Sequence, residues 1–98
     1  MTEAGKEIIA LFKKKGKFTL AGNREYWEEI YHIDGKIICA GGESHGNIEK
    51  YRDEISEDDA LRKIKSYFSS RARVFNRDSN IETDLDVLNY WKDHPYEG

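Results

Sequence analysis

An Asp-Gly pair at positions 34 and 35 separates two runs of strand-forming residues, 30–33 and 36–39. Asp-Gly is favoured in a two-residue type I′ turn, because both central positions of that turn need a positive φ. The sequence therefore predicts a β-hairpin with a fixed register. The expected cross-strand pairs are Ile33 with Lys36, His32 with Ile37, Tyr31 with Ile38, and Ile30 with Cys39.

Both faces of this predicted hairpin are apolar. Side chains alternate along a strand, so residues two apart share a face. One face is expected to carry Trp27, Tyr31, Ile33, Ile38 and Ala40, and the opposite face Tyr26, Ile30, His32, Ile37 and Cys39. A sheet of this kind is either covered by helices on both faces or leaves one aromatic face open for a partner. The sequence does not decide which.

The segments on both sides of the hairpin contain helix signals. Residues 3–15 place apolar side chains at helical spacing, with glutamates first and lysines last before Gly16, an order that suits the helix dipole. Ser56 with an aspartate three residues later is typical of a helix start, and a helix to about Ala72 is predicted. A last helix is predicted from Thr83 or Asp84 to just before the His94-Pro95 pair.

Shorter elements complete the expected order. We predict a short strand at 18–20, a turn into a strand at 25–33, a loop at 41–47, an edge strand at 48–55 and a loop at 76–80. The predicted class is α+β, with an N-terminal helix, an antiparallel meander of three to four strands around Asp34-Gly35, and two C-terminal helices. The expected core residues are Ile8, Phe12, Ile30 or Tyr31, Ile38, Leu61, Ile64, Phe68, Leu85 and Leu88.

Length and composition fit one small folded domain that spans residues 1–98. A chain of 98 residues suffices for a single core, and a net charge of only -3 favours a folded state. The single cysteine, Cys39, excludes a disulfide framework within the chain. Apolar runs are shorter than a membrane span and the N-terminus does not resemble a secretory signal, so we expect a cytoplasmic protein without membrane contact.

Charge is segregated along the chain in four alternating blocks. Residues 1–24 and 60–77 are basic, with six Lys or Arg in each, whereas 25–59 and 78–98 are acidic. On the helix predicted after Ser56, a basic stripe is a candidate site for phosphates or carboxylates. The stripe consists of Arg62, Lys65, Ser69 and Arg73. The alternative is that these residues solvate the helix and pair with the acidic blocks of the same chain.

The sequence gives little support for catalysis. His32 lies diagonal to Cys39, the only thiol, on one predicted face, which is a weak nucleophile and base arrangement. The His and Cys residues do not have the spacing of a metal site, and the segment 41–47 lacks the Gly-Lys-Ser/Thr ending of a phosphate-binding loop. We therefore expect no cofactor, no metal and no enzymatic activity, with a small thiol-dependent enzyme as an alternative.

The candidate partner-binding residues lie on the strand before the turn. They are Tyr26, Trp27, Glu28, Glu29 and Tyr31. Aromatic anchors beside acidic groups are typical of a surface that docks on a basic, partly apolar protein. The sequence thus favours a non-enzymatic protein-binding module of the adaptor, immunity or inhibitor type, in an undetermined oligomeric state. Three alternatives stay open: the rings belong to the core, the acidic block mimics nucleic acid, or the chain binds nucleic acid or another phosphate through the basic stripe.

Overall fold

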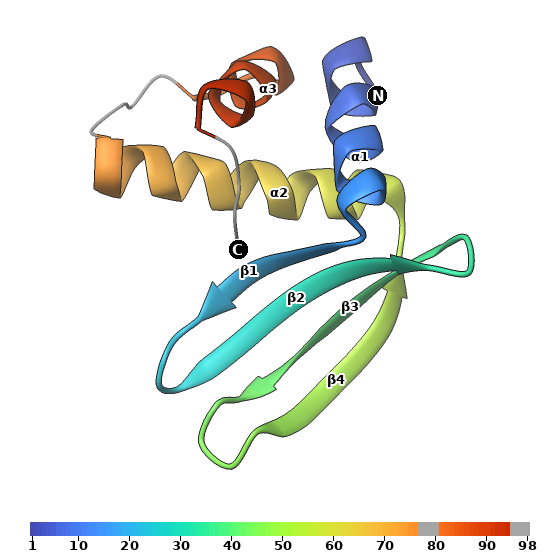
Figure 1. Ribbon diagram of the computed structural model, residues 1–98, viewed down its shortest axis with the longest axis vertical. Helices are drawn as coiled ribbons and strands as arrows, with labels where there is room; N and C mark the ends of the chain where they lie inside the picture. The colour runs from blue at the N-terminus through green and yellow to red at the C-terminus, as the bar shows by residue number, and fades with distance from the viewer. Residues whose placement is uncertain (77–80, 95–98) are drawn as a thin grey trace.

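A computed structural model describes residues 1–76 and 81–94 (Figure 1). The elements are α1 (Glu3–Lys15), β1 (Lys17–Gly22), β2 (Tyr26–Ile33), β3 (Lys36–Glu43), β4 (Ile48–Ile55), α2 (Glu57–Arg71), a π-helical segment (Ala72–Asn76) and α3 (Asp84–Asp93). The four strands form one antiparallel sheet in the order β1-β2-β3-β4. This is the predicted α+β arrangement. The predicted loop at 76–80 falls on the π-helical segment at Asn76 and otherwise lies outside the described residues.

The helices begin and end where the sequence signals place them. Gly16 ends α1 with a φ of 87°, in the left-handed region that glycine adopts without strain. The Ser56 hydroxyl accepts a hydrogen bond from the Asp59 amide at the start of α2. At the start of α3, Thr83 and Asp86 form a reciprocal capping box. These contacts satisfy amides that a helix otherwise leaves without partners at its first turn.

The hairpin has the predicted register. Asp34 and Gly35 have φ values of 52° and 76°, and Ile30 pairs with Cys39 as expected. The predicted loop at 41–47 is wrong in its first part, because β3 continues to Glu43. The glycine at position 42 serves a close approach rather than a turn: a Cβ there would lie 2.0 Å from the Ile48 carbonyl oxygen, beside a register shift between β3 and β4.

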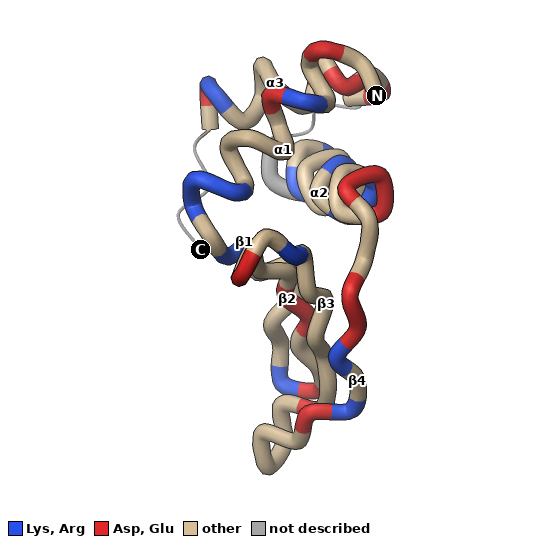
Figure 2. Tube along the Cα trace, turned by 90° about the vertical axis from the view of Figure 1, so that its right-hand side faces the viewer, with Lys and Arg blue, Asp and Glu red and all other residues tan. Residues whose placement is uncertain are grey.

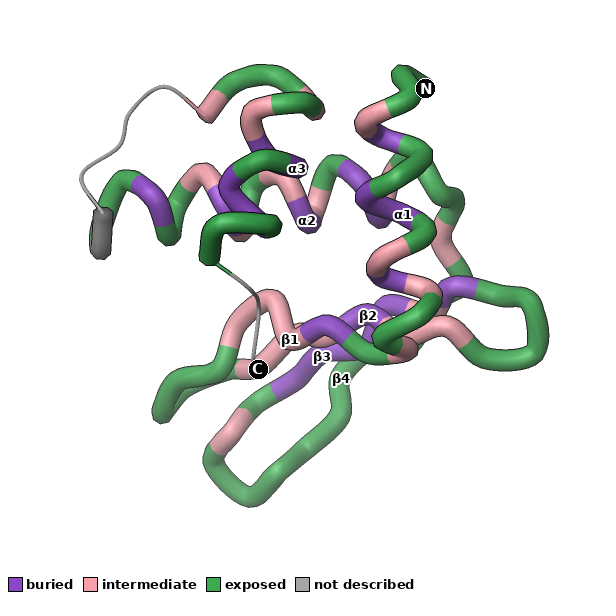
Figure 3. Tube along the Cα trace, turned by 45° about the horizontal axis from the view of Figure 1, so that its top comes forward, coloured by how far each residue is buried: buried purple, intermediate pink, exposed green. Residues whose placement is uncertain are grey.

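All three α-helices lie on one face of the sheet (Figure 1). Buried positions run along the helices and through β1, β2 and β3, whereas β4 is almost entirely exposed (Figure 3). Phe18 of β1 is fully buried at the centre of this layer. Its ring centroid lies 5.0 Å from that of Tyr67, 5.7 Å from that of Phe68 and 5.5 Å from that of Trp91. Phe18 therefore connects the sheet to both C-terminal helices through edge-to-face aromatic contacts.

Most of the expected core is buried, but two of its members are not. Of the two alternatives on β2, Ile30 is fully buried and Tyr31 is half-buried. Ile38 is half-buried because it pairs with Tyr31 on the face that carries no helix. Leu85 is 57% exposed, so the prediction that it belongs to the core is wrong.

The Leu85 error has a geometric cause in α3. Leu85, Leu88 and Trp91 are spaced by three residues, and each such step falls about 60° short of a full turn of an α-helix. Leu85 is therefore rotated by about 120° from Trp91. Val87 takes its place beside Leu88 and Trp91 on the buried face.

In the part of the chain that the structure describes, no helix has the length and apolar content needed to cross a bilayer.

Leu88 and Leu85 provide a matched test of this packing, since both lie in α3. Leu88 is 3% exposed and Leu85 is 57% exposed. We expect Leu88→Ala to lower the free energy of unfolding by about 2–5 kcal/mol, because it leaves a cavity in the core. Leu85→Ala should change it by less than about 0.5 kcal/mol. Urea denaturation of both variants checks this, and equal losses would contradict the assigned orientation of α3.

Candidate functional site

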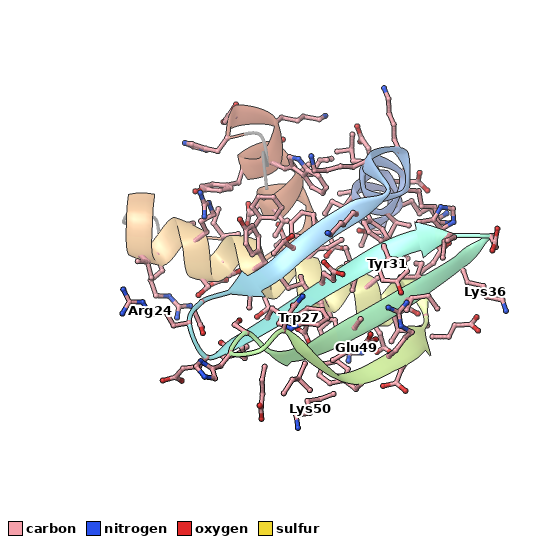
Figure 4. All side chains as sticks on the ribbon, turned by 60° about the horizontal axis from the view of Figure 1, so that its bottom comes forward. Arg24, Trp27, Tyr31, Lys36, Glu49 and Lys50 are labelled. Atoms are coloured by element: carbon pink, nitrogen blue, oxygen red, sulfur yellow. The ribbon has the colours of Figure 1, made fainter. Side chains whose placement is uncertain are left out.

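The face of the sheet turned away from the helices carries a cluster of aromatic and apolar side chains. We call it the open face and define it by Trp27, Tyr31, Ile38 and Ala40, with Ile33 at the hairpin end. Trp27 and Tyr31 both lie on this side of the sheet, with Glu49 of β4 (Figure 4). Both rings are half-buried by their neighbours within the sheet rather than by helices. The helices therefore cover only one face of the sheet, and the face that carries Trp27 and Tyr31 has no helix on it.

The predicted partner-binding residues are divided between the two faces. Trp27, Glu29 and Tyr31 lie on the open face, whereas Tyr26 and Glu28 alternate to the side that carries the helices. Tyr26 is 52% exposed and is the first residue of β2. The structure thus brings three of the five candidates together and separates the other two from them.

Ion pairs border the aromatic centre of the open face. Lys17 of β1 pairs with Glu29 at 3.0 Å. On the opposite side, the Arg52 guanidinium donates to both carboxylate oxygens of Glu49 at 2.7 and 3.3 Å, and its carbon lies 5.4 Å from the centroid of the Tyr31 ring. Trp27 Nε1 and Tyr31 Oη are buried atoms that have no hydrogen-bond partner among the described residues. Such unsatisfied donors are uncommon in folded proteins.

A hollow of about 400 Å³ opens at the Trp27 end of this face. It is bordered by Trp27 and Glu29 of β2, by Glu49 of β4, and by Asn47 of the preceding turn. Asn47 has a φ of 54°, a left-handed conformation that asparagine tolerates better than most residues. The hollow combines one indole ring with two carboxylates, so its chemistry suits a cation with a flat or apolar part.

A polar cluster on the other face centres on Glu28. One oxygen of its carboxylate accepts from Tyr51 Oη at 2.5 Å, from Lys63 Nζ at 3.5 Å and from Cys39 Sγ at 3.7 Å. A Cβ on Gly41 would lie 2.2 Å from Tyr51 Oη, so this glycine makes room for the tyrosine to reach across β3. No local sequence pattern predicts this cluster, because it depends on the register of three strands.

Both hydroxyl and thiol in this cluster are held in their protonated forms. Burial raises the pKa of the Cys39 thiol, and the Glu28 carboxylate raises it further. Burial, a hydrogen bond to Glu28 and the charge of Glu28 likewise raise the pKa of Tyr51. A thiol is a nucleophile only as the thiolate. His32, the base considered for Cys39, pairs with Ile37 in the hairpin, and the acceptor beside the sulfur is Glu28.

Three residues of the basic stripe already have partners within the chain. Lys65 pairs with Asp84 at 2.7 Å, and Arg62 pairs with Asp59 at 3.0 Å. The Ser69 hydroxyl donates to the Ile81 carbonyl oxygen at 3.2 Å. Arg73 lies beyond the end of α2, exposed in the π-helical segment. Along α2, the first turn is acidic and the Lys and Arg residues come after it (Figure 2).

Asp84 connects the first turns of α1 and α3 to the middle of α2. Its carboxylate accepts from Lys65 of α2 and from Thr2, which caps α1, while Asp84 itself opens α3. Hydrogen bonds from Lys65 and Thr2 lower the pKa of this carboxyl. The Lys65 cation therefore stabilises the helix layer, and its availability to an external anion depends on breaking this pair.

Two further sources of information, possible metal sites and similarity to known proteins, do not indicate a function. Among residues 1–76 and 81–94, no three or more His, Cys, Asp or Glu side chains are grouped so as to hold a metal ion. No protein-family model matches the chain, and no curated protein or solved structure matches it. Function is therefore inferred from the surfaces of the chain itself.

The Cys39 environment predicts a slowly reacting thiol. In the native protein, Cys39 should react with a disulfide reagent at least about 100-fold more slowly than in urea, because reaction requires local opening as well as ionisation. The rate of release of the coloured thiolate from the reagent measures this. A native rate equal to that of the unfolded chain would show an accessible thiol and would favour the thiol-enzyme alternative.

The Tyr51 environment predicts a contribution to alkaline unfolding. The pKa of Tyr51 is raised in the folded state, so above the unfolded value of about 10 the unfolded chain loses this proton first. The free energy of unfolding should therefore fall with rising pH above about 10, and less steeply in Tyr51→Phe. Urea titrations at a series of pH values test this. Identical slopes for the two proteins would contradict the assigned hydrogen bond to Glu28.

Proposed function

We infer that this chain is a non-enzymatic protein-binding module, of the adaptor, immunity or inhibitor type, that docks on a larger protein through the open face. The observation that carries this proposal is the one-sided placement of the helices, which leaves Trp27, Tyr31 and Ile38 uncovered. A solvated sheet face is ordinarily polar. Aromatic side chains in a contiguous surface cluster are the residues that contribute most to protein interfaces.

The border of the open face favours a protein partner over nucleic acid. Glu29 and Glu49 flank the rings, and the nearby cations Lys17 and Arg52 are already engaged by these carboxylates. A phosphate backbone brought to this face would meet negative charge. The alternative phosphate site on the basic stripe requires Lys65 to leave Asp84, whereas Arg62, 77% exposed along its side chain, is held only by a surface pair.

The proposal includes two further statements, that the protein is not an enzyme and that it is cytoplasmic. A protonated, buried Cys39 fits a structural thiol, because the Glu28 carboxylate beside it raises the pKa of the thiol and no histidine among the described residues pairs with it. Replacement of Cys39 by serine should therefore leave partner binding intact. A free thiol at this position fits a reducing compartment, which supports a cytoplasmic location.

Adjacent residues of β2 provide the test, because Trp27 and Tyr26 point to opposite faces. Tagged protein is used to capture partners from native lysate of the source cells, with and without nuclease. We expect one stoichiometric protein partner whose capture does not depend on nucleic acid. Trp27→Ser should lower the affinity for this partner by about 100-fold, whereas Tyr26→Ser should leave it unchanged. Thermal unfolding of both variants confirms that they are folded.

Two outcomes would overturn the proposal. Retention of the partner by Trp27→Ser, together with its loss in an Arg62→Glu, Lys65→Glu double variant, would place binding on the basic stripe. Capture of nucleic acid whose affinity falls steeply with salt would assign the chain to the phosphate-binding alternative.

A further inference from the structure

The hollow beside Trp27 owes its shape to the register of the sheet. Trp27 pairs with Gly42 of β3, and Gly42 pairs with Glu49 of β4, so the three residues form one cross-strand row. Gly42 lets β4 approach closely here, because the position that a Cβ would take lies 2.0 Å from the Ile48 carbonyl oxygen, and Trp27 and Glu49 border the hollow on either side of it. Glu29, two residues along β2 from Trp27, lies on the same face and closes another side.

The same face already holds one guanidinium by this chemistry. Arg52 lies over the ring of Tyr31 and donates two hydrogen bonds to Glu49. An aromatic ring and a carboxylate therefore position an arginine within the chain. The hollow offers a larger ring and two carboxylates, and none of the four residues that border it is Lys or Arg.

We propose that this hollow receives an arginine side chain of the partner protein, an inference that rests on the proposed function. The guanidinium stacks on the indole of Trp27, the aromatic group that binds cations most strongly. Its N–H groups donate to Glu29 and to Glu49, whose two oxygens each accept one hydrogen bond from Arg52 and can each accept another. Glu29 can exchange its partner Lys17 for the guanidinium, because the Lys17 side chain is 62% exposed. Surface ion pairs of this kind contribute little to the free energy of unfolding.

Arginine fits the hollow better than the other side chains a partner can bring. An acidic side chain is repelled by Glu29 and Glu49. An apolar side chain covers these carboxylates without replacing the hydrogen bonds they make to water. Lysine brings the charge but not the planar fork that stacks on a ring and donates to two carboxylates at once.

A peptide series tests the inference on the full chain by two-dimensional NMR. Three capped tripeptides, Gly-Xaa-Gly, carry arginine, citrulline or glutamate at the central position. Citrulline has nearly the shape of arginine but no charge. The indole N–H signal of Trp27 reports binding, and that of Trp91, which is 8% exposed in the core, is the internal reference. We expect the arginine peptide to shift only the Trp27 signal, with an affinity at least about fivefold that of citrulline.

Two glutamates of β4 give a matched pair of variants. Glu49 borders the hollow, whereas Glu54 lies on the same face but pairs with Ile38, outside it. Glu49→Gln should weaken binding of the arginine peptide by about threefold or more, and Glu54→Gln should leave it unchanged. Equal binding of arginine and citrulline, or equal effects of the two variants, would overturn the assignment to the hollow.

The peptide result and the capture result separate the two proposals. If Trp27→Ser loses the protein partner but no arginine peptide shifts the Trp27 signal, the arginine assignment fails and docking on the open face stands. If Trp27→Ser retains the partner, docking on the open face fails, and arginine binding in the hollow is then no part of partner recognition.

Discussion

The alternation of side chains along β2 and β3 determines the rest of this fold. The turn at Asp34 and Gly35 fixes it, because both residues adopt the positive φ values that a two-residue connection needs. Ile30 is thereby directed to the helices and Tyr31 away from them. A shift of one residue would exchange these faces. Since both faces are apolar, hydrophobicity alone opposes such a shift only weakly, and the turn carries much of the specificity.

One-sided coverage follows from the number of elements available. Three α-helices pack on the face that contains Phe18, and no further helix is present among the described residues to cover the other. Trp27 and Tyr31 consequently bury most of their area against neighbours in their own sheet, while Nε1 and Oη find no acceptor there. A folded chain tolerates such groups only when packing compensates for them. The open face is thus a surface whose own contacts are incomplete.

The parts of the structure that could be predicted from sequence are those set by neighbours in the chain. The turn fixed the pairing of Ile30 with Cys39, and Ser56 and Thr83 marked helix starts, because each signal spans only a few residues. Which face the helices cover depends on long-range packing, so Ile38 was misplaced. Glu28 looked like a surface acid beside Glu29, yet it accepts hydrogen bonds from β3, β4 and α2. No local pattern contains that information.

The alternating charge blocks, conspicuous along the sequence, cancel largely in space. Ion pairs join basic to acidic blocks at Lys17 with Glu29, Lys63 with Glu28, and Lys65 with Asp84. These pairs support the alternative in which the basic stripe pairs with the acidic blocks of the same chain. Of these pairs, Lys17 with Glu29 has the most exposed cation and is weak, so a partner that brings its own cation can replace Lys17 at little cost. On the open face, an anionic partner would have to displace Glu29 from Lys17 or Glu49 from Arg52, and both carboxylates border the hollow beside Trp27. The charge pattern and the uncovered aromatic rings thus favour the same class of partner, a protein with basic side chains.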